Sequence, residues 1–161
     1  MPGLFEHSER KYRVGQILRT SATCAWQDVA AEHRRHPAVV LPANEVGQME
    51  ICIATRSDER TRVTRKSDGD FQDSRSQAGM VWLCPIGVVE EEVHLTAPLE
   101  LLHIYLPVSR FEQLSEVCGG EPVKASSVGY IAGIRDDLIS QIGSTILGGN
   151  AIGNARRKGP D

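Results

Sequence analysis

Short runs of β-compatible residues, separated by turn-forming residues, dominate the first two thirds of the chain. The run Met49–Thr55 is apolar on both parities, as expected of a strand that is buried on both faces. Asp68-Gly69 lies between two such runs and is typical of a tight hairpin, because both residues tolerate positive φ. The predicted strands are Val14–Thr20, Trp26–His36, Met49–Thr55, Arg60–Lys66, Met80–Cys84, Val88–Leu95 and Leu99–Leu106. About seven short strands with a turn every 8–12 residues predict a mainly β domain, built as a sandwich or a barrel.

Beyond Leu106 the hydrophobic period changes to that of helices. Ser109 and Glu112 match a capping box and Gly119-Gly120 supplies a stop, so a short helix is expected between them. An apolar stripe at intervals of three and four residues predicts a second helix, with the members Ile131, Ile134, Leu138, Ile142 and Ile146. The stripe packs either on the wall of its own domain or against the same stripe of a second subunit, since it is narrow enough for a two-helix seam.

These patterns divide the chain into four parts. We expect a loose N-terminus over residues 1–13, a β domain over 14–106, a helical dimerisation or linker segment over 107–149 and a disordered tail over 150–161. The tail is assigned as disordered because it has few apolar residues and several helix breakers.

Composition and charge narrow the class of protein. The 161 residues are 40% hydrophobic and 24% charged, which is ordinary for one globular domain, and the net charge of −3 argues against direct DNA binding. No apolar run approaches the ~20 residues that span a bilayer, and the N-terminus lacks a secretory pattern. We therefore expect a cytoplasmic protein without membrane contact. Its cysteines are then expected to be free thiols, namely Cys24, Cys52, Cys84 and Cys118.

Three segments resemble the N-terminal half of AraC-type transcription regulators. They are Trp26 with the following Glu32–Pro37, the strand and turn Gly79–Gly87, and Leu102–Pro107 with the adjoining Phe111–Leu114. The similarity covers roughly residues 14–147 and lies in the order of segments more than in any single motif.

This resemblance implies a cupin-like (jelly-roll) β-barrel followed by two C-terminal α-helices. In the family such a domain binds a small effector, its helices mediate dimerisation, and a further helix-turn-helix domain reads DNA. Nothing after Leu147 has the pattern of a helix-turn-helix, so no direct DNA binding is expected from this chain. Either a deliberately shortened chain or a frameshifted gene product fits, and the abrupt loss of helical pattern favours the frameshift.

Cupins also include metal enzymes, whose strands carry two histidines spaced by two residues, a glutamate and a further histidine. Here His33 and His36 are spaced by three and would point to opposite faces of a strand. The second cupin motif keeps its turn residues Gly79, Pro85 and Gly87, but Glu90 occupies the position of its histidine. His94 with Glu92 offers only an unconventional pair, which a surface or core histidine explains better. We therefore expect no metal and no other cofactor.

No nucleophile or nucleotide-binding motif occurs, so the leading hypothesis is a non-catalytic module that senses an effector and dimerises. The residues expected to line the effector site are Trp26, His33, Trp82, His103 and Tyr105, although parity alone leaves open which strand face is inside. The stripe Ile131, Ile134, Leu138, Ile142 and Ile146 would form a homodimer, or a mixed dimer with a full-length relative. The alternatives are a small cupin enzyme acting on a small polar substrate and a structural remnant without activity.

Overall fold

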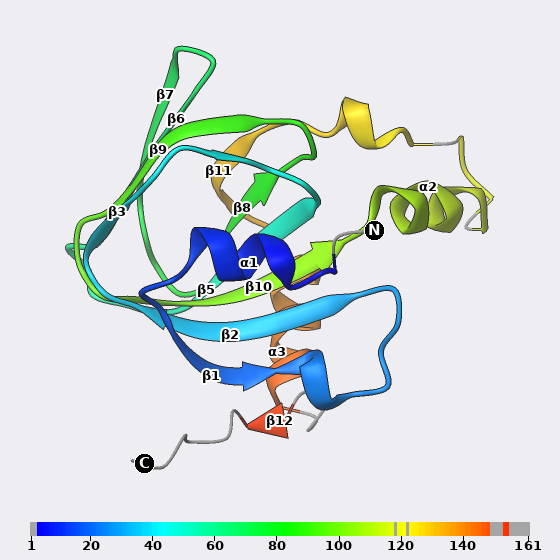
Figure 1. The fold of residues 1–161 in the computed structure, drawn as a ribbon, viewed down its shortest axis with the longest axis horizontal. Helices are drawn as coiled ribbons and strands as arrows, with labels where there is room; N and C mark the ends of the chain where they lie inside the picture. Colours follow the sequence, from blue (N-terminus) through cyan, green and yellow to red (C-terminus); the bar gives the residue numbers. More distant parts are fainter. Residues whose placement is uncertain (1–2, 118, 122, 149–152, 155–161) are drawn as a thin grey trace.

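The computed structural model describes residues 3–117, 119–121, 123–148 and 153–154, and it is mainly β as the sequence predicted (Figure 1). The larger sheet is antiparallel and has the strand order β11-β8-β5-β10-β2-β1-β12. Its strands are β1 (Gln16–Thr20), β2 (Ala30–His36), β5 (Met49–Ser57), β8 (Met80–Cys84), β10 (Leu99–Leu106), β11 (Ile131–Arg135) and β12 (Gly153–Asn154).

The smaller sheet has the order β3-β9-β6-β7, with β4 also paired to β9. Its strands are β3 (Val39–Leu41), β4 (Asn44–Glu45), β6 (Arg62–Ser67), β7 (Asp70–Arg75) and β9 (Val89–Leu95). The predicted hairpin is confirmed, since Asp68 and Gly69 both take positive φ between β6 and β7. The remaining elements are α1 (Glu6–Lys11), α2 (Val108–Val117), α3 (Asp137–Gly148) and two short 3₁₀ turns, Ser21–Thr23 and Ala125–Ser127.

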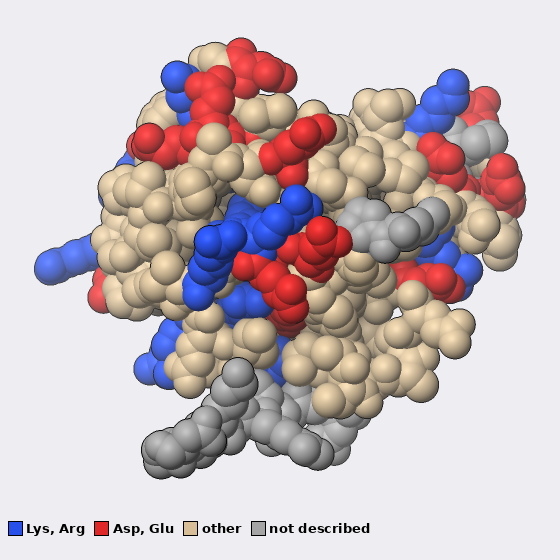
Figure 2. Space-filling view, in the orientation of Figure 1, with Lys and Arg blue, Asp and Glu red and all other residues tan. Residues whose placement is uncertain are grey.

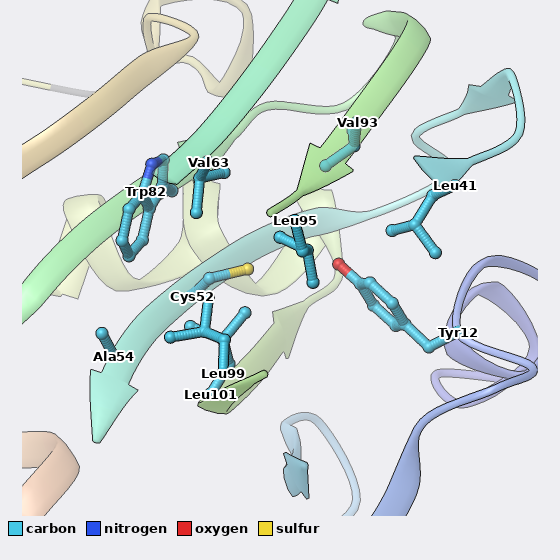
Figure 3. Close-up of a cluster of buried hydrophobic side chains, with 10 residues drawn as sticks. All are labelled: Tyr12, Leu41, Cys52, Ala54, Val63, Trp82, Val93, Leu95, Leu99 and Leu101. Atoms are coloured by element: carbon cyan, nitrogen blue, oxygen red, sulfur yellow. The ribbon is translucent and has the colours of Figure 1, made fainter. Parts of the chain in front are cut away.

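Apolar side chains from both sheets meet in one buried cluster (Figure 3). Cys52 and Trp82 come from the larger sheet and Val63 and Val93 from the smaller one, so the cluster joins the two layers. Tyr12 reaches the same cluster from the residue after α1, and its hydroxyl points inward in Figure 3. The two sheets therefore pack together through apolar side chains on their inward faces.

A second apolar cluster covers the outer face of the larger sheet. Ile53, Leu102 and Ile104 project outward there, and Ile139 and Ile146 of α3 pack against them. Gly143 of α3 lies so close to Ile53 that an added Cβ would be 2.8 Å from its Cδ1. The helix thus covers its own sheet, while Leu138 and Ile142 on its other side remain exposed.

The N-terminus predicted to be loose contains α1, which lies across the larger sheet in Figure 1. His7, Ser8 and Lys11 of this helix are buried, as is Tyr12 behind it. The prediction was wrong because the segment EHSERK has no apolar residue, whereas its burial depends on polar partners far away in the sequence.

The single helix predicted from the Ile131–Ile146 stripe is also wrong, because its first part is β11 and only Asp137–Gly148 is helical. Ile131 pairs with Leu83 and Ile134 with Val81 on β8, with a register shift between them. Gly133 lies at this irregularity with a φ of 59°. A bulge therefore gives two isoleucines on a strand the spacing of three that is usual in a helix. In the tail, Gly153–Asn154 pairs with β1, and residues 150–152 and 155–161 lie outside the described residues.

Replacing Gly133 with alanine is expected to lower the free energy of unfolding by about 1–3 kcal/mol, because a left-handed backbone is strained for any residue with a Cβ. The new Cβ would also lie 2.8 Å from that of Ser74. Urea unfolding measures the loss. Gly47→Ala is the matched control, since no atom lies within 4 Å of the Cβ built there, and equal losses in both variants would contradict the bulge.

Candidate functional site

Helix α1 brings polar side chains into the space between the two sheets. His7 and Lys11 are four residues apart, so they share one face of the helix, and Tyr12 follows at its end. They meet side chains from β2, β5, β9 and β10 that are also buried. We name this group the interior cluster, and it consists of His7, Lys11, Tyr12, His36, Glu50, Cys52, Glu90 and His103.

The carboxylate of Glu50 is the centre of the interior cluster and is 0% exposed. Its Oε2 lies 3.2 Å from both His7 Nε2 and Lys11 Nζ, and its Oε1 lies 2.8 Å from His103 Nδ1. The Tyr12 hydroxyl also donates to Oε1. Burial alone would raise the pKa of this carboxyl, but the ammonium of Lys11 and the bonds from His103 and His7 outweigh burial and hold the pKa well below its usual value.

Lys11 carries the positive charge of the interior cluster, and its ammonium contacts two carboxylates. One belongs to Glu50, 3.2 Å away, and the other to Glu90, which also accepts a 2.7 Å hydrogen bond from the Tyr130 hydroxyl. Burial would lower the pKa of the amine, but Glu50 and Glu90 together raise it well above its usual value. Lys11 is therefore charged although it is only 4% exposed.

Two histidines extend the interior cluster away from Glu50. His103 Nε2 lies 2.8 Å from His36 Nε2. Burial lowers the pKa of both rings, that of His36 to about 2, so both are neutral at pH 7. Because His103 Nδ1–H donates to Glu50, its Nε2 is an acceptor, and His36 must donate through Nε2–H. The resulting relay runs from His36 through His103 to Glu50.

One part of the interior cluster has the donor atoms of a metal site. Glu50, Cys52 and His103 each offer one ligand atom, and these atoms lie within 4.8 Å of one another. A carboxylate, a thiol and an imidazole are ligands that zinc accepts. However, burial and then the charge of Glu50 raise the pKa of the Cys52 thiol, which opposes the thiolate that a metal needs. The three residues therefore fit a metal poorly as long as Lys11 is paired with Glu50. The expectation that the chain holds no metal stays a prediction.

A cavity of about 30 Å³ adjoins the interior cluster. Its lining includes polar side chains and aliphatic ones. The polar group is Lys11, Tyr12, Cys52, Arg65, Cys84 and Glu90, and the apolar group is Trp82, Leu41, Val63, Val93, Leu95 and Leu101. Space of this size holds about two water molecules. A larger guest therefore fits only where Lys11 and Tyr12 withdraw.

Three of the five residues predicted to line an effector site face the interior. His103 is in the interior cluster, the Tyr105 ring stacks on it with centroids 6.2 Å apart, and Trp82 lines the cavity. His33 lies on the other face of β2, where its Nε2 is 2.8 Å from Thr55 Oγ1. Trp26 is 37% exposed before β2, beside a surface hollow that also includes Arg110. The structure thus separates Trp26 and His33 from the other three.

Sequence reasoning missed His7, Lys11, Tyr12, Glu50 and Cys52 as members of a site. Glu50 is the only charged residue in the otherwise apolar run Met49–Thr55, and Cys52 follows it by two residues, which places both on one strand face. That isolated charge was a usable signal. The sequence analysis compared Glu90 with a histidine of the second cupin motif. Lys11, its partner in the ion pair, lies 79 residues away in the sequence, and no local pattern connects the two.

The five residues of the predicted dimerisation stripe do not form one surface. Leu138 is 67% and Ile142 48% exposed, whereas Ile134 and Ile146 pack on the larger sheet and Ile131 lies on β11. Basic and acidic side chains intermix on the face around α1 in Figure 2, so this face presents no continuous basic surface. Among the described residues, no helix is long and apolar enough to cross a membrane. Cys52 and Cys84 are buried thiols without disulfides, as predicted, and Cys118 lies outside the described residues.

Comparison with known proteins yields distant structural similarity alone. No protein-family model and no curated protein matches the chain. A cupin domain from Bordetella pertussis is similar with a TM-score of 0.43 and 10% identity, over 57% of this chain and 92% of that one. A putative ethanolamine utilization protein from Salmonella typhimurium has a TM-score of 0.40 and 14% identity over 50% of this chain, and the Clostridium difficile EutQ protein has 0.43 and 12% over 58%. The matches span 59% and 66% of those two chains, and similarity at this level establishes no family.

Proposed function

We propose that this chain is a small-molecule-binding domain of the cupin type, that the interior cluster is its binding site and that α1 covers this site. The observation that carries the proposal is the set of charged and titratable side chains buried between the two sheets around Glu50. The strand order supports the cupin type, because neighbours such as β2 and β10 or β5 and β8 are distant in sequence, as in the double Greek key of a jelly roll.

Stability alone explains the interior cluster poorly. Moving charges out of water costs several kcal/mol per ion, and well-packed apolar residues of similar volume often give a protein that is about as stable or more so. Strongly shifted pKa values are common at functional sites, because burial and neighbouring charges there adjust the pKa to the chemistry. Here the pKa values of Lys11, Glu50, Cys52 and His103 are all displaced. Function is therefore the better reason for keeping these groups in the interior.

Spare hydrogen-bonding capacity also favours a binding site. Among the described residues, the Tyr105 hydroxyl and His7 Nδ1 are buried and have no protein partner. The two rings are neighbours, with centroids 6.2 Å apart. Buried polar groups are rarely left unpaired, so a polar guest beside Tyr105 and His7 would gain hydrogen bonds at no cost to the fold.

The biological role that fits this function is the effector-sensing and dimerising half of an AraC-type transcription regulator. The resemblance of Gly79–Gly87 and Leu102–Pro107 to that family supports it, as does the exposed face of α3. In this role the chain is cytoplasmic and non-catalytic, and it pairs with itself or with a related regulator.

Substituting Leu138 with aspartate is expected to shift a dimer toward monomer, because Leu138 is the most exposed apolar residue of α3 and a charge there would be buried in the seam. Sedimentation equilibrium measures the mass with and without the substitution. Val117→Asp is the control, since Val117 is 82% exposed on a different helix. A wild-type chain that sediments as a monomer would contradict this part of the proposal.

A small cupin enzyme acting on a small polar substrate is the second candidate. The relay from His36 through His103 to Glu50 favours an enzyme. Its two neutral imidazoles and its carboxylate are joined by hydrogen bonds along which a proton can pass. Turnover of a compound that binds, abolished by His103→Gln and retained by His94→Gln, would select this candidate over a purely sensory role.

A thermal-shift comparison tests the proposed function. Wild-type protein, Glu50→Gln and the control Glu91→Gln are screened against the same panel of small amines, acids, sugars and neutral polar compounds. Glu91 is a suitable control because it forms an exposed ion pair with Lys66. We expect compounds that raise the unfolding temperature of wild type and of Glu91→Gln but not of Glu50→Gln. The proposal fails if every active compound acts equally on all three proteins, or if none acts on wild type.

A further inference from the structure

The interior cluster already holds one small cation, the ammonium group of Lys11. Nζ lies 3.2 Å from Glu50 Oε2, contacts Glu90 Oε1, and is 5.0 Å from the centre of the Tyr12 ring. Two carboxylates and an aromatic face form a complementary setting for an alkylammonium ion. The helix that supplies this ion belongs to neither sheet.

The charges around Lys11 do not balance without it. Among the described residues, Glu50 and Glu90 form ion pairs with no other lysine or arginine. Arg65 is nearby, but its guanidinium bonds to Cys84 Sγ, the side chain of Gln72 and the carbonyl of Ile131. Burial keeps His36 and His103 neutral, and the ion pair of His7 is with Glu50 and not with Glu90. Whatever replaces Lys11 must therefore carry positive charge, because two uncompensated carboxylates cannot remain buried.

The cavity beside Lys11 indicates what a ligand would carry besides its positive charge. Part of its wall is aliphatic, with Leu41, Val63 and Val93 among its members. This wall suits a short apolar body, and the carboxylates suit a charged head that donates hydrogen bonds in three directions, as a primary ammonium does. Sugars and anions match neither feature.

Helix α1 can detach from the two sheets. It has six residues, far below the length at which a helix is stable alone. Side chains of Ser8 and of the interior cluster hold it on the sheets, and Arg34 Nη1 donates to the carbonyl of Tyr12 at its end. A guest that satisfies Glu50 and Glu90 removes the main contacts that hold Lys11 inside.

We propose that Lys11 is a displaceable internal occupant, and that the ligand of this site is a small compound with a primary ammonium group on a short apolar body. This rests on the proposed function and adds the ligand class, because Lys11 shows in the structure what the site accepts. Binding exchanges one ammonium for another and leaves the buried charge unchanged.

Chemical rescue of Lys11→Ala in the full chain tests this inference. The substitution removes the equivalent of a propylammonium ion, so n-propylammonium chloride is expected to raise the unfolding temperature, by about 3–5 °C at ten times its dissociation constant. Propan-1-ol and sodium chloride at the same concentration should not. Lys11→Met fills the same space without charge, and Lys66→Ala removes an exposed lysine, so neither should respond.

Each outcome decides the inference. Rescue by n-propylammonium that disappears in Lys11→Ala/Glu90→Gln supports it, whereas rescue by propan-1-ol, by divalent cations alone or by nothing overturns it. If Lys11→Ala does not fold unaided, its refolding from urea with and without n-propylammonium gives the same decision. Acids or sugars that bind wild type but not Glu50→Gln would leave the proposed function standing and refute the ammonium class alone.

Discussion

Replacing Glu50 with alanine is expected to lower the free energy of unfolding by about 3–5 kcal/mol, the usual cost of removing one partner from a buried ion pair. The substitution leaves Lys11 with Glu90 alone, and His7, Tyr12 and His103 each lose a hydrogen bond to the carboxylate. The hydrogen-bond donors that faced Glu50 would remain buried without its carboxylate unless α1 detached. Urea denaturation at pH 7, followed by circular dichroism, measures the loss.

Two comparisons make the result for Glu50 specific. Glu91→Ala breaks an exposed pair with Lys66 and should leave stability unchanged within error. The double variant Lys11→Met/Glu50→Leu should lose less than the sum of its single substitutions, because each removes the charge that the other needs. A loss below about 1 kcal/mol for Glu50→Ala would mean that Glu50 is not at the centre of a paired interior cluster.

Acidification from pH 6.5 to 5 is expected to remove about 2–3 kcal/mol of stability, at a rate approaching 1.4 kcal/mol per pH unit for each buried neutral histidine. Burial lowers the pKa of His36 to about 2 and also lowers that of His103, so the folded chain binds fewer protons at these positions than the unfolded chain does. The unfolded chain takes up protons there below pH 6.5. It therefore binds more protons than the native state, and stability falls as the pH falls.

The carboxyl of Glu50 and the amine of Lys11 affect stability outside the range from pH 5 to 6.5. The lowered pKa of Glu50 gives stability that is present above pH 4.5 and is lost as the pH falls through its folded pKa. The raised pKa of Lys11 gives stability that is present below pH 10.5 and is lost only as the pH rises through its folded pKa. Between about pH 7 and 9 neither changes charge in the folded or unfolded chain, so these two groups add no slope there.

Urea unfolding at pH 6.5 and 5 tests the histidine account. His36→Gln should lose less stability on acidification than wild type does, because one of the buried imidazoles with a lowered pKa is gone. His94→Gln, outside the interior cluster, should lose as much as wild type does. An acid loss that is the same in His36→Gln as in wild type would assign the pH dependence to other groups.

The strands could be predicted because local patterns determine them. Met49–Thr55 and Leu99–Leu106 carry their apolar residues where β5 and β10 bury them, and Asp68-Gly69 marks a hairpin by backbone chemistry alone. The Ile131–Ile134 spacing misled because a bulge at Gly133 mimics a helical period. Local periodicity cannot distinguish these cases, since the difference lies in the pairing of β11 with β8.

The interior cluster could be predicted only in part. The sequence singled out Glu90 by its spacing from Gly79, Pro85 and Gly87 and named His103 as a candidate lining residue, and both are buried in the interior cluster. The sequence does not show that a lysine 79 residues earlier would reach Glu90. Such pairs depend on the packing of α1 between the sheets, and a segment as polar as Glu6–Lys11 has no pattern that indicates burial.

Native-state hydrogen exchange measured by NMR tests most directly whether α1 is a cover over a binding site. If it is, the amides of Glu9 and Tyr12, which bond to the carbonyls of Phe5 and Ser8, exchange through a local opening. Their opening free energy should then be several-fold smaller than that of the β10 amides, which report global unfolding. Equal opening free energies for α1 and β10 would show that α1 is a fixed part of the core, and would contradict a ligand site beneath it.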